Sequence, residues 1–300
     1  MDNIEIRDIR KQFGKKEVLK GLSLSVPEGA ACGLLGKNGA GKTTLNRILT
    51  GLAFPTSGSV SVCGMAAGSS QVAYLSENIS VFPGLTAYEN IEQIFLLDGM
   101  KPDRQFILDL LNRIEIENSR KKAGKFSLGM KRRLQIGMSV LTASRPVMIL
   151  DEPTNGLDLN GVLWLKDTIR KLKEEGKTLL ITSHAIRELE EELTDYAILY
   201  DGVIAASGKT ASLGENLLAI RFDEHQSGQA GQVIGQKGIG HTQNGNEILI
   251  PCPSPSQEKE ILTLLLAEGI APRTYEMRST SLVDLFRSCT RGDEGDESHA

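Results

Sequence analysis

The segment GKNGAGKT, from Gly36 to Thr43, constrains the fold most, because it fits the pattern G-x-x-x-x-G-K-[S/T]. A short apolar run precedes it, and apolar residues at helical spacing follow it over 45–52. A strand–loop–helix unit of this kind points backbone N–H groups and the positive end of a helix dipole at bound phosphate. A glycine-rich turn that matches by chance is the alternative, but the strand and helix are placed as the motif requires. We therefore predict a nucleotide site with contacts from Gly36, Lys37, Asn38, Gly39, Ala40, Gly41, Lys42, Thr43 and Thr44.

Hydrophobic periodicity predicts an α/β fold around this loop. Apolar residues near the start of the chain, over 4–9 and 22–26, alternate with a period of two and indicate antiparallel strands. Residues 78–145 are mostly helical in pattern. From 147 to 183 the chain runs strand, helix, strand, which predicts a βαβ unit with parallel strands. Asp201 and Gly202 between two apolar runs predict a hairpin turn.

Two carboxylates follow the buried strand VMIL, residues 147–150. Because α/β sheets bind their ligands at the carboxyl ends of parallel strands, Asp151 and Glu152 should face the phosphate loop. An Asp-Glu pair after a strand is more often a helix cap or a solvated turn, but beside a phosphate loop we expect a catalytic role. Asp151 is suited to hold Mg²⁺ opposite the Thr43 hydroxyl, and Glu152 to orient and deprotonate water. Lys42 would reach the β- and γ-phosphates.

One histidine falls on the same predicted edge. His184 follows the strand TLLITS, residues 178–183. A lone histidine is more often a packed or exposed bystander. At this strand end, however, we expect His184 near the γ-phosphate, as a catalytic residue together with Glu152 and Lys42.

Composition excludes several classes of protein. A net charge of -4 argues against a general nucleic-acid binder, so no nucleic-acid partner is expected. No apolar run approaches the roughly 18–20 residues that cross a bilayer, and the charged, alternating start of the chain is unlike a signal peptide. We therefore expect no membrane span in this chain. The four cysteines are scattered without metal-ligand spacing and are expected to be reduced thiols.

The chain changes character after about residue 210. Residues 226–246 are rich in Gly and Gln, and we expect a flexible connection there. The strand-like EILI, a helical pattern over about 256–268, a strand near 273–277 and a helix that opens at Ser281 then predict a small α+β appendage. The sequence thus divides into a domain over 1–212, an accessory α+β domain over 213–288 and an acidic, disordered tail over 289–300.

Taken together, the motifs over about residues 3–210 resemble an ABC ATPase. FSLGM, residues 126–130, stands where that family has its LSGGQ signature; it keeps Ser127 and Gly129 and departs at Leu128 and Met130. A helix that begins near Ser127 could offer N–H groups and a hydroxyl to a γ-phosphate, which in this family belongs to the opposite subunit's nucleotide. An ordinary helix N-cap is the alternative. The resemblance implies a RecA-like P-loop NTPase core with an antiparallel β subdomain and a helical subdomain at about 78–145.

Three more positions match the family in order. Phe13 resembles the aromatic residue that stacks on adenine, although a core phenylalanine is the alternative, and residues 156–158 resemble the loop that passes between subunits. Glu77 occupies the place of a glutamine that contacts Mg²⁺ and the membrane partner. A carboxylate can still bind Mg²⁺, so the predicted metal ligands are Thr43, Glu77 and Asp151.

The resemblance also implies the partners. A chain with one phosphate loop and one signature needs a second subunit, either a copy of itself or another ABC subunit, to complete each ATP site. It would work with an integral membrane permease at the cytoplasmic face of the inner (cell) membrane. FSLGMKRR, DEPTNGLD and LTAYEN resemble exporters that protect against drugs or lantibiotics; YLSENISVFPGLT and SLVDLFRS also resemble the ATPases of nitrous oxide reductase maturation.

Two rival functions stay open at this point. A soluble ABC ATPase of DNA repair or translation would resemble a tandem or coiled-coil-interrupted chain, and neither pattern is present. A regulatory subunit that binds ATP without turnover would lack Lys42, Glu152 or His184, and all three are present. For the exporter, the cargo is either a drug or peptide antibiotic, or copper or sulfur for an enzyme's metal cluster.

Overall fold

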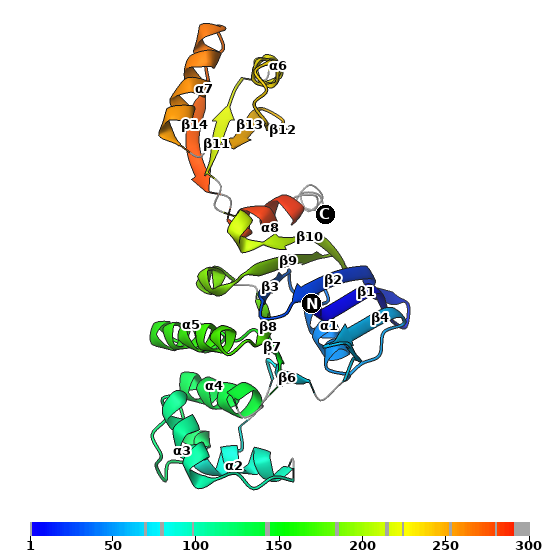
Figure 1. The fold of residues 1–300 in the computed structure, drawn as a ribbon, viewed down its shortest axis with the longest axis vertical. Helices are drawn as coiled ribbons and strands as arrows, with labels where there is room; N and C mark the ends of the chain where they lie inside the picture. Colours follow the sequence, from blue (N-terminus) through cyan, green and yellow to red (C-terminus); the bar gives the residue numbers. More distant parts are fainter. Residues whose placement is uncertain are drawn as a thin grey trace, which may run out of the picture. The chain divides into compact units, whose positions relative to one another are not determined.

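The structure is a computed structural model in which the chain forms two compact units, each described separately below: Met1–Thr210 with Cys289–Ala300, and Ala211–Ser288 (Figure 1). Within its described residues, no helix combines the length and apolarity needed to cross a membrane. Cys32, Cys63 and Cys289 are free thiols, and burial raises the pKa of Cys32 to about 12. The structure describes residues 2–68, 71–78, 81–97, 99–141, 145–183, 186–213, 216–223, 225–251, 254–279 and 281–290.

A six-stranded sheet with the order β10-β9-β3-β8-β7-β6 forms the centre of the first unit. The five strands from β9 to β6 are parallel, and β10 pairs with β9 in antiparallel fashion through the predicted hairpin. Every residue of β3, β7 and β8 is buried, which explains their continuous apolar sequences. The strands are β3 (Ala31–Leu35), β6 (Val72–Leu75), β7 (Val147–Asp151), β8 (Thr178–Ser183), β9 (Asp195–Tyr200) and β10 (Val203–Lys209).

An antiparallel sheet with the order β2-β1-β4-β5 packs against the first through helix α1 (Lys42–Leu49). Its alternating burial matches the period of two in the sequence. Leu45, Ile48 and Leu49 of α1 share one core with residues of both sheets. Leu52, which continues the helical spacing in the sequence, lies beyond the helix and is 70% exposed. The strands are β1 (Asp2–Phe13), β2 (Lys16–Pro27), β4 (Ser57–Val62) and β5 (Met65–Ala66).

The predicted helical segment lies between β6 and β7 and contains α2 (Ala87–Leu97), α3 (Arg104–Arg113) and α4 (Leu128–Ile136) (Figure 1). Ser127 caps α4: its side-chain oxygen accepts a hydrogen bond from the Met130 backbone N–H. A π-helical turn, Gly137–Leu141, continues α4. Helix α5 (Leu159–Glu174) joins β7 to β8, as the βαβ pattern predicts. The structure therefore confirms an α/β P-loop fold with an antiparallel and a helical subdomain.

The second unit is an α+β domain with the order of elements β11-α6-β12-β13-α7-β14, followed by α8. Its four strands form one antiparallel sheet in the order β12-β13-β11-β14, the arrangement of ferredoxin-like βαββαβ folds. Side chains of β11, β13, α6 and α7 form its core. The elements are β11 (Asn216–Arg221), α6 (Ser227–Gln236), β12 (Thr242–Asn244), β13 (Glu247–Pro251), α7 (Pro255–Ala267), β14 (Thr274–Ser279) and α8 (Leu282–Thr290).

The prediction of a flexible connection over 226–246 is wrong, because α6 and β12 occupy most of it. Ala230 and Ile234, one helical turn apart, are both fully buried against the sheet. This packing outweighs the low helix propensity of the glycines around them. At the other end, α8 extends through Cys289 and Thr290, where the sequence predicts the start of the acidic tail; residues 291–300 lie outside the described residues.

The packing of α6 predicts a measurable loss of stability. Ile234→Ala should lower the free energy of unfolding of the C-terminal unit by about 2–4 kcal/mol, because it leaves a cavity at a fully buried position. Gln232→Ala, at an exposed position of the same helix, is the matched control and should stay within about 0.5 kcal/mol of the wild type. Urea unfolding followed by circular dichroism measures both. Equal stabilities for the two variants would contradict the packing of α6.

Candidate nucleotide-binding site

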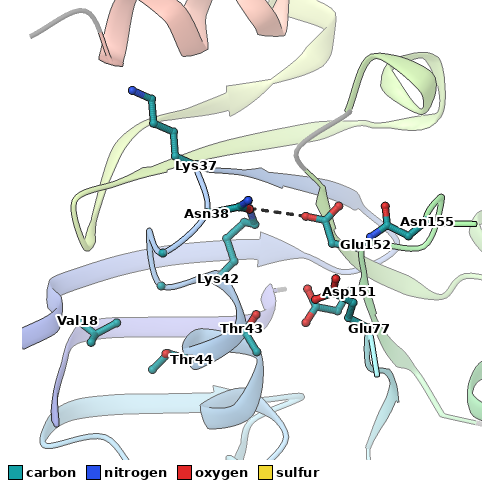
Figure 2. Close-up of a pocket in the computed structure, with 12 residues that line it drawn as sticks. Val18, Lys37, Asn38, Lys42, Thr43, Thr44, Glu77, Asp151, Glu152 and Asn155 are labelled. Atoms are coloured by element: carbon teal, nitrogen blue, oxygen red, sulfur yellow. Dashed lines mark ion pairs between the residues drawn. The ribbon is translucent and has the colours of Figure 1, made fainter. Parts of the chain in front are cut away.

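The phosphate loop connects the buried strand β3 to the first turn of α1, so its position is set at both ends. Gly41 has a φ of 111°, and a Cβ there would lie 2.7 Å from the Leu19 Cδ2 atom, so only glycine fits. A cavity of about 340 Å³ opens beside the loop, within the size range of small-ligand sites. Figure 2 shows its lining. The lining residues are Val18, Lys37, Asn38, Gly39, Gly41, Lys42, Thr43, Thr44, Glu77, Asp151, Glu152 and Asn155.

Lys42 supplies a buried positive charge to this cavity. Its side chain is 8% exposed, and its Nζ donates a hydrogen bond of 2.5 Å to the Gly36 carbonyl. The same Nζ lies 3.7 Å from a Glu152 carboxylate oxygen (dashed line in Figure 2). A buried ammonium group needs such anionic and hydrogen-bonding partners. It is therefore held over the loop, where it can bind phosphate.

Asp151 ends β7 and is 2% exposed. One of its carboxylate oxygens accepts a hydrogen bond of 2.5 Å from the Thr182 hydroxyl, and the other accepts one of 3.2 Å from the Tyr74 hydroxyl. Burial, together with the charge of Asp151, raises the pKa of Tyr74 to about 12, so this phenol keeps the proton that it donates. The carboxylate is thereby fixed in orientation from two neighbouring strands, β8 and β6.

Glu152 follows Asp151 in an unusual backbone conformation. Its φ is 47°, in the left-handed region that residues with a Cβ rarely adopt. Its N–H donates to the Thr182 carbonyl at 2.9 Å, and its side chain is 8% exposed. This turn brings the carboxylate to Lys42 instead of leaving it in solvent. The arrangement differs from an ordinary solvated turn, the alternative that the sequence left open.

The oxygen donors at one side of the cavity suit Mg²⁺. Figure 2 shows the carboxylates of Glu77 and Asp151 together, across the cavity from Thr43. Hard oxygen ligands of this kind are what Mg²⁺ prefers, usually one or two carboxylates plus substrate phosphates. In the ranges that the structure describes, no group of three or more His, Cys, Asp or Glu side chains could hold a metal ion on its own. The residues present therefore fit a metal ion that is bound jointly with a nucleotide.

Several predicted contacts lie elsewhere. Gly36 and Ala40 are not among the lining residues; Gly36 instead offers its carbonyl to Lys42, and Ala40 packs against the core. Phe13 is 53% exposed at the end of β1, with Lys11 Nζ 4.8 Å from its ring centroid, so it is not a core residue. It does not line the cavity either, and its stacking on adenine stays a prediction. His184 lies outside the described residues, directly after β8.

The signature-like segment also lies apart from this cavity. Ser127 and Gly129 do not line it; at the start of α4, Ser127 is exposed and Gly129 is half-buried. Ser127 forms the N-cap hydrogen bond that the alternative interpretation predicts, at 3.2 Å from the Met130 backbone N–H. Capping and phosphate binding are compatible, because the hydroxyl keeps its own proton to donate.

Tyr74 and Thr182 are site residues that sequence reasoning missed. Thr182 is the parallel-strand partner of Asp151, so the pairing of VMILD with TLLITS contains the signal that could have found it. Tyr74 has no such local signal, because β6 is joined to β7 through the whole helical subdomain. Buried strands and a phosphate loop opposite two carboxylates define a P-loop nucleotide-binding protein of the α/β class.

Comparison with known proteins places the chain within that class. Residues 19–155 match the family described as ABC transporter. The chain is 36% identical over 205 residues to SrtF, a lantibiotic transport ATP-binding protein of Streptococcus pyogenes, and the match spans 67% of this chain and 88% of SrtF. It is 32% identical over 311 residues to LnrL, a linearmycin resistance ATP-binding protein of Bacillus subtilis, with 96% and 98% covered.

Solved structures agree with this placement. The ATP-binding subunit of an ABC transporter is 26% identical, with a TM-score of 0.62 over 69% of this chain and 89% of that one. A dimeric ATP-binding cassette, solved in a post-hydrolysis state with ADP and phosphate, shares the fold at 23% identity and a TM-score of 0.62, over 69% of this chain and 98% of that one. The chain therefore belongs to the ABC transporter family, as an ATP-binding subunit that hydrolyses ATP.

The hydrogen bond from Thr182 to Asp151 predicts a metal-dependent effect on nucleotide binding. Thr182→Val preserves shape but removes the donor that orients the carboxylate, and should weaken ATP binding in the presence of Mg²⁺ about 10–100-fold. Titration calorimetry with ATP, in MgCl₂ and in EDTA, measures the effect. Thr168→Val is the matched control, since that buried hydroxyl donates to the Trp164 carbonyl within α5. A loss of the same size in EDTA would contradict the role of Thr182.

Proposed function

We propose that this chain energises an exporter of drugs or peptide antibiotics, working on a separately encoded integral membrane permease at the cytoplasmic face of the cell membrane. The observation that carries the energising, ATP-hydrolysing part of the proposal is the cavity in which Lys42 faces Glu152 beside Asp151. The names of the relatives support the cargo class, since SrtF is a lantibiotic transport protein and LnrL a linearmycin resistance protein. The likeness to LnrL extends over 96% of this chain, beyond the ATPase unit.

In the proposed reaction, water attacks the γ-phosphorus of ATP and the bond to the β-phosphate oxygen breaks, which releases ADP and phosphate. Glu152 is the group placed to orient the water and accept its proton. The Lys42 ammonium, 3.7 Å from that carboxylate, stabilises negative charge on the transferred group. Thr43, Asp151 and Glu77 would hold Mg²⁺, which supplies further charge neutralisation at the phosphates.

The proposed assembly is a dimer with two composite sites. The start of α4, with the exposed Ser127 and the half-buried Gly129, does not line the chain's own cavity but has the free N–H groups of a helix N-terminus. A second ATP-binding subunit, identical or different, would present this segment to the nucleotide held by the first. Closure around ATP and release after hydrolysis would then drive the permease.

A substitution of the proposed base tests the chemistry. Glu152→Gln preserves size but removes the proton acceptor, so the ATPase rate should fall about 10²–10⁴-fold. ATP-dependent dimerisation should persist, because the phosphate loop is intact; a phosphate-release assay and size-exclusion chromatography with ATP measure the two properties. Glu117→Gln, at an exposed position outside the cavity, is the control. Turnover near the wild-type rate would remove Glu152 from this role.

Membrane association tests the proposed partner. The tagged full chain should retain an integral membrane protein when membranes of its native cells are solubilised in mild detergent, as mass spectrometry would show. Cells in which Lys42→Ala replaces the wild type should keep this association but become sensitive to a peptide antibiotic or drug, because hydrolysis is lost. If no integral membrane protein is retained, the chain is instead a soluble, non-transport ABC ATPase.

A further inference from the structure

Arg132 lies in the second turn of α4 and is 4% exposed. In the sequence it is one residue of the basic run that follows FSLGM, with no sign of a separate role. In the structure its guanidinium reaches across to the turn that carries the site's carboxylates. Nη2 donates to the carbonyls of Asp151, at 2.9 Å, and Glu152, at 2.5 Å. Nε donates to the Pro153 carbonyl at 3.3 Å.

Three consecutive carbonyls are thus bound by one planar group. A guanidinium has five N–H donors in a rigid fork, so it can bind several acceptors at once. Nη1 uses another donor on the Gln135 side-chain oxygen, at 3.4 Å, which steadies the fork from the next turn of α4. Lysine, with one ammonium on a flexible chain, could not reproduce this set of contacts.

The bound turn is the strained one. Glu152 has its φ at 47°, and its N–H is held by the Thr182 carbonyl. Such a conformation persists only where its surroundings over-determine it. β8 holds the turn through that N–H, and Arg132 holds it through the carbonyls of Asp151, Glu152 and Pro153. The Glu152 carboxylate, carried by this turn, lies beside Lys42.

The positive charge of Arg132 is complementary to the carboxylates around it. Burial lowers the pKa of Arg132, while the nearby carboxylates of Asp151, Glu77 and Glu152 act in the opposite direction. A guanidinium stays protonated under such conditions. Arg132 and Glu77 also line one cleft of about 560 Å³ together with Leu128, Asn155 and Gly156, so the cation shares this cleft with the carboxylate that stands where the family has glutamine. Arg132 therefore offsets part of the negative charge of these carboxylates.

We propose that Arg132 is a positioning residue for ATP hydrolysis, which holds the 151–153 turn so that the Glu152 carboxylate faces the attacking water. The inference rests on the proposed role of Glu152 as base. It also ties α4, which begins at the Ser127 cap, to the base of the same chain through direct hydrogen bonds. When Ser127 binds a nucleotide held by another subunit, α4 and Arg132 would transmit this binding to the position of the Glu152 carboxylate, which acts on the chain's own ATP.

The test is a pair of lysine substitutions on one helix. Arg132→Lys should lower kcat about 10–100-fold with KM and the Kd for ATP within about twofold, because a displaced base slows chemistry without weakening binding. Arg133→Lys is the matched control: Arg133 pairs with Glu115 and stacks on Trp164, away from the turn, and its kcat should stay within about twofold. Unchanged kcat in Arg132→Lys, or an equal loss in both variants, would overturn the proposal.

A double substitution separates this proposal from the proposed base. If Arg132 acts through Glu152, then Arg132→Lys should not slow a Glu152→Gln enzyme any further. The same factor of slowing in both backgrounds would show that Arg132 acts otherwise, and the inference would fall while the base stands. If Glu152→Gln alone leaves the rate unchanged, the base assignment itself fails.

Should Arg132→Lys not fold, shown by a lost thermal transition, Gln135→Met provides a milder test. It removes the acceptor that steadies Nη1 but leaves the guanidinium in place. A fall in kcat of about 3–10-fold, at unchanged KM and Tm, is the expected result for a partly released positioning group. Full activity in Gln135→Met, with Arg132→Lys unfolded, would overturn the proposal in favour of a purely structural arginine.

Discussion

The parallel register of β3, β8 and β7 is the constraint on which the nucleotide site depends. Leu35 pairs with Ser183, and Asp151 pairs with Thr182, so the three strands end at one edge of the sheet. These strands are buried on both faces, and a slip of one residue would turn every side chain to the opposite face. Strand pairing alone thus places the phosphate loop opposite the carboxylates, without any contribution from electrostatic attraction.

Buried charges then refine that arrangement. Lys42, Arg132, Asp151 and Glu152 are each less than a tenth exposed, and an unpartnered ion at such depth costs on the order of several kcal/mol. Each cation meets this demand differently: Lys42 binds a loop carbonyl and a carboxylate, whereas Arg132 binds the main chain of the turn itself. Lys42 therefore holds the turn through the side chain of Glu152, and Arg132 holds the same turn through its backbone carbonyls.

Local sequence patterns are sufficient to predict the strands and helices that carry the motifs, because strand burial, helix spacing and the phosphate loop are all encoded within short segments. Tyr74 and Arg132 could not be found in this way, since their roles arise only when β6 and α4 pack beside the end of β7. The prediction for the segment that forms helix α6 is wrong for a related reason. Its glycine-rich composition resembles a linker, whereas the helix is stabilised by Ala230 and Ile234, which are buried against a sheet formed by distant segments.

The left-handed backbone at Glu152 has a consequence for how this position can change. A residue with a Cβ in that conformation costs about 1–2 kcal/mol, whereas glycine or asparagine adopts it readily. Neither of those residues has a carboxylate. Under the proposed role of Glu152 as base, selection for a more stable fold and selection for turnover favour different amino acids at residue 152, and the sequence retains the carboxylate.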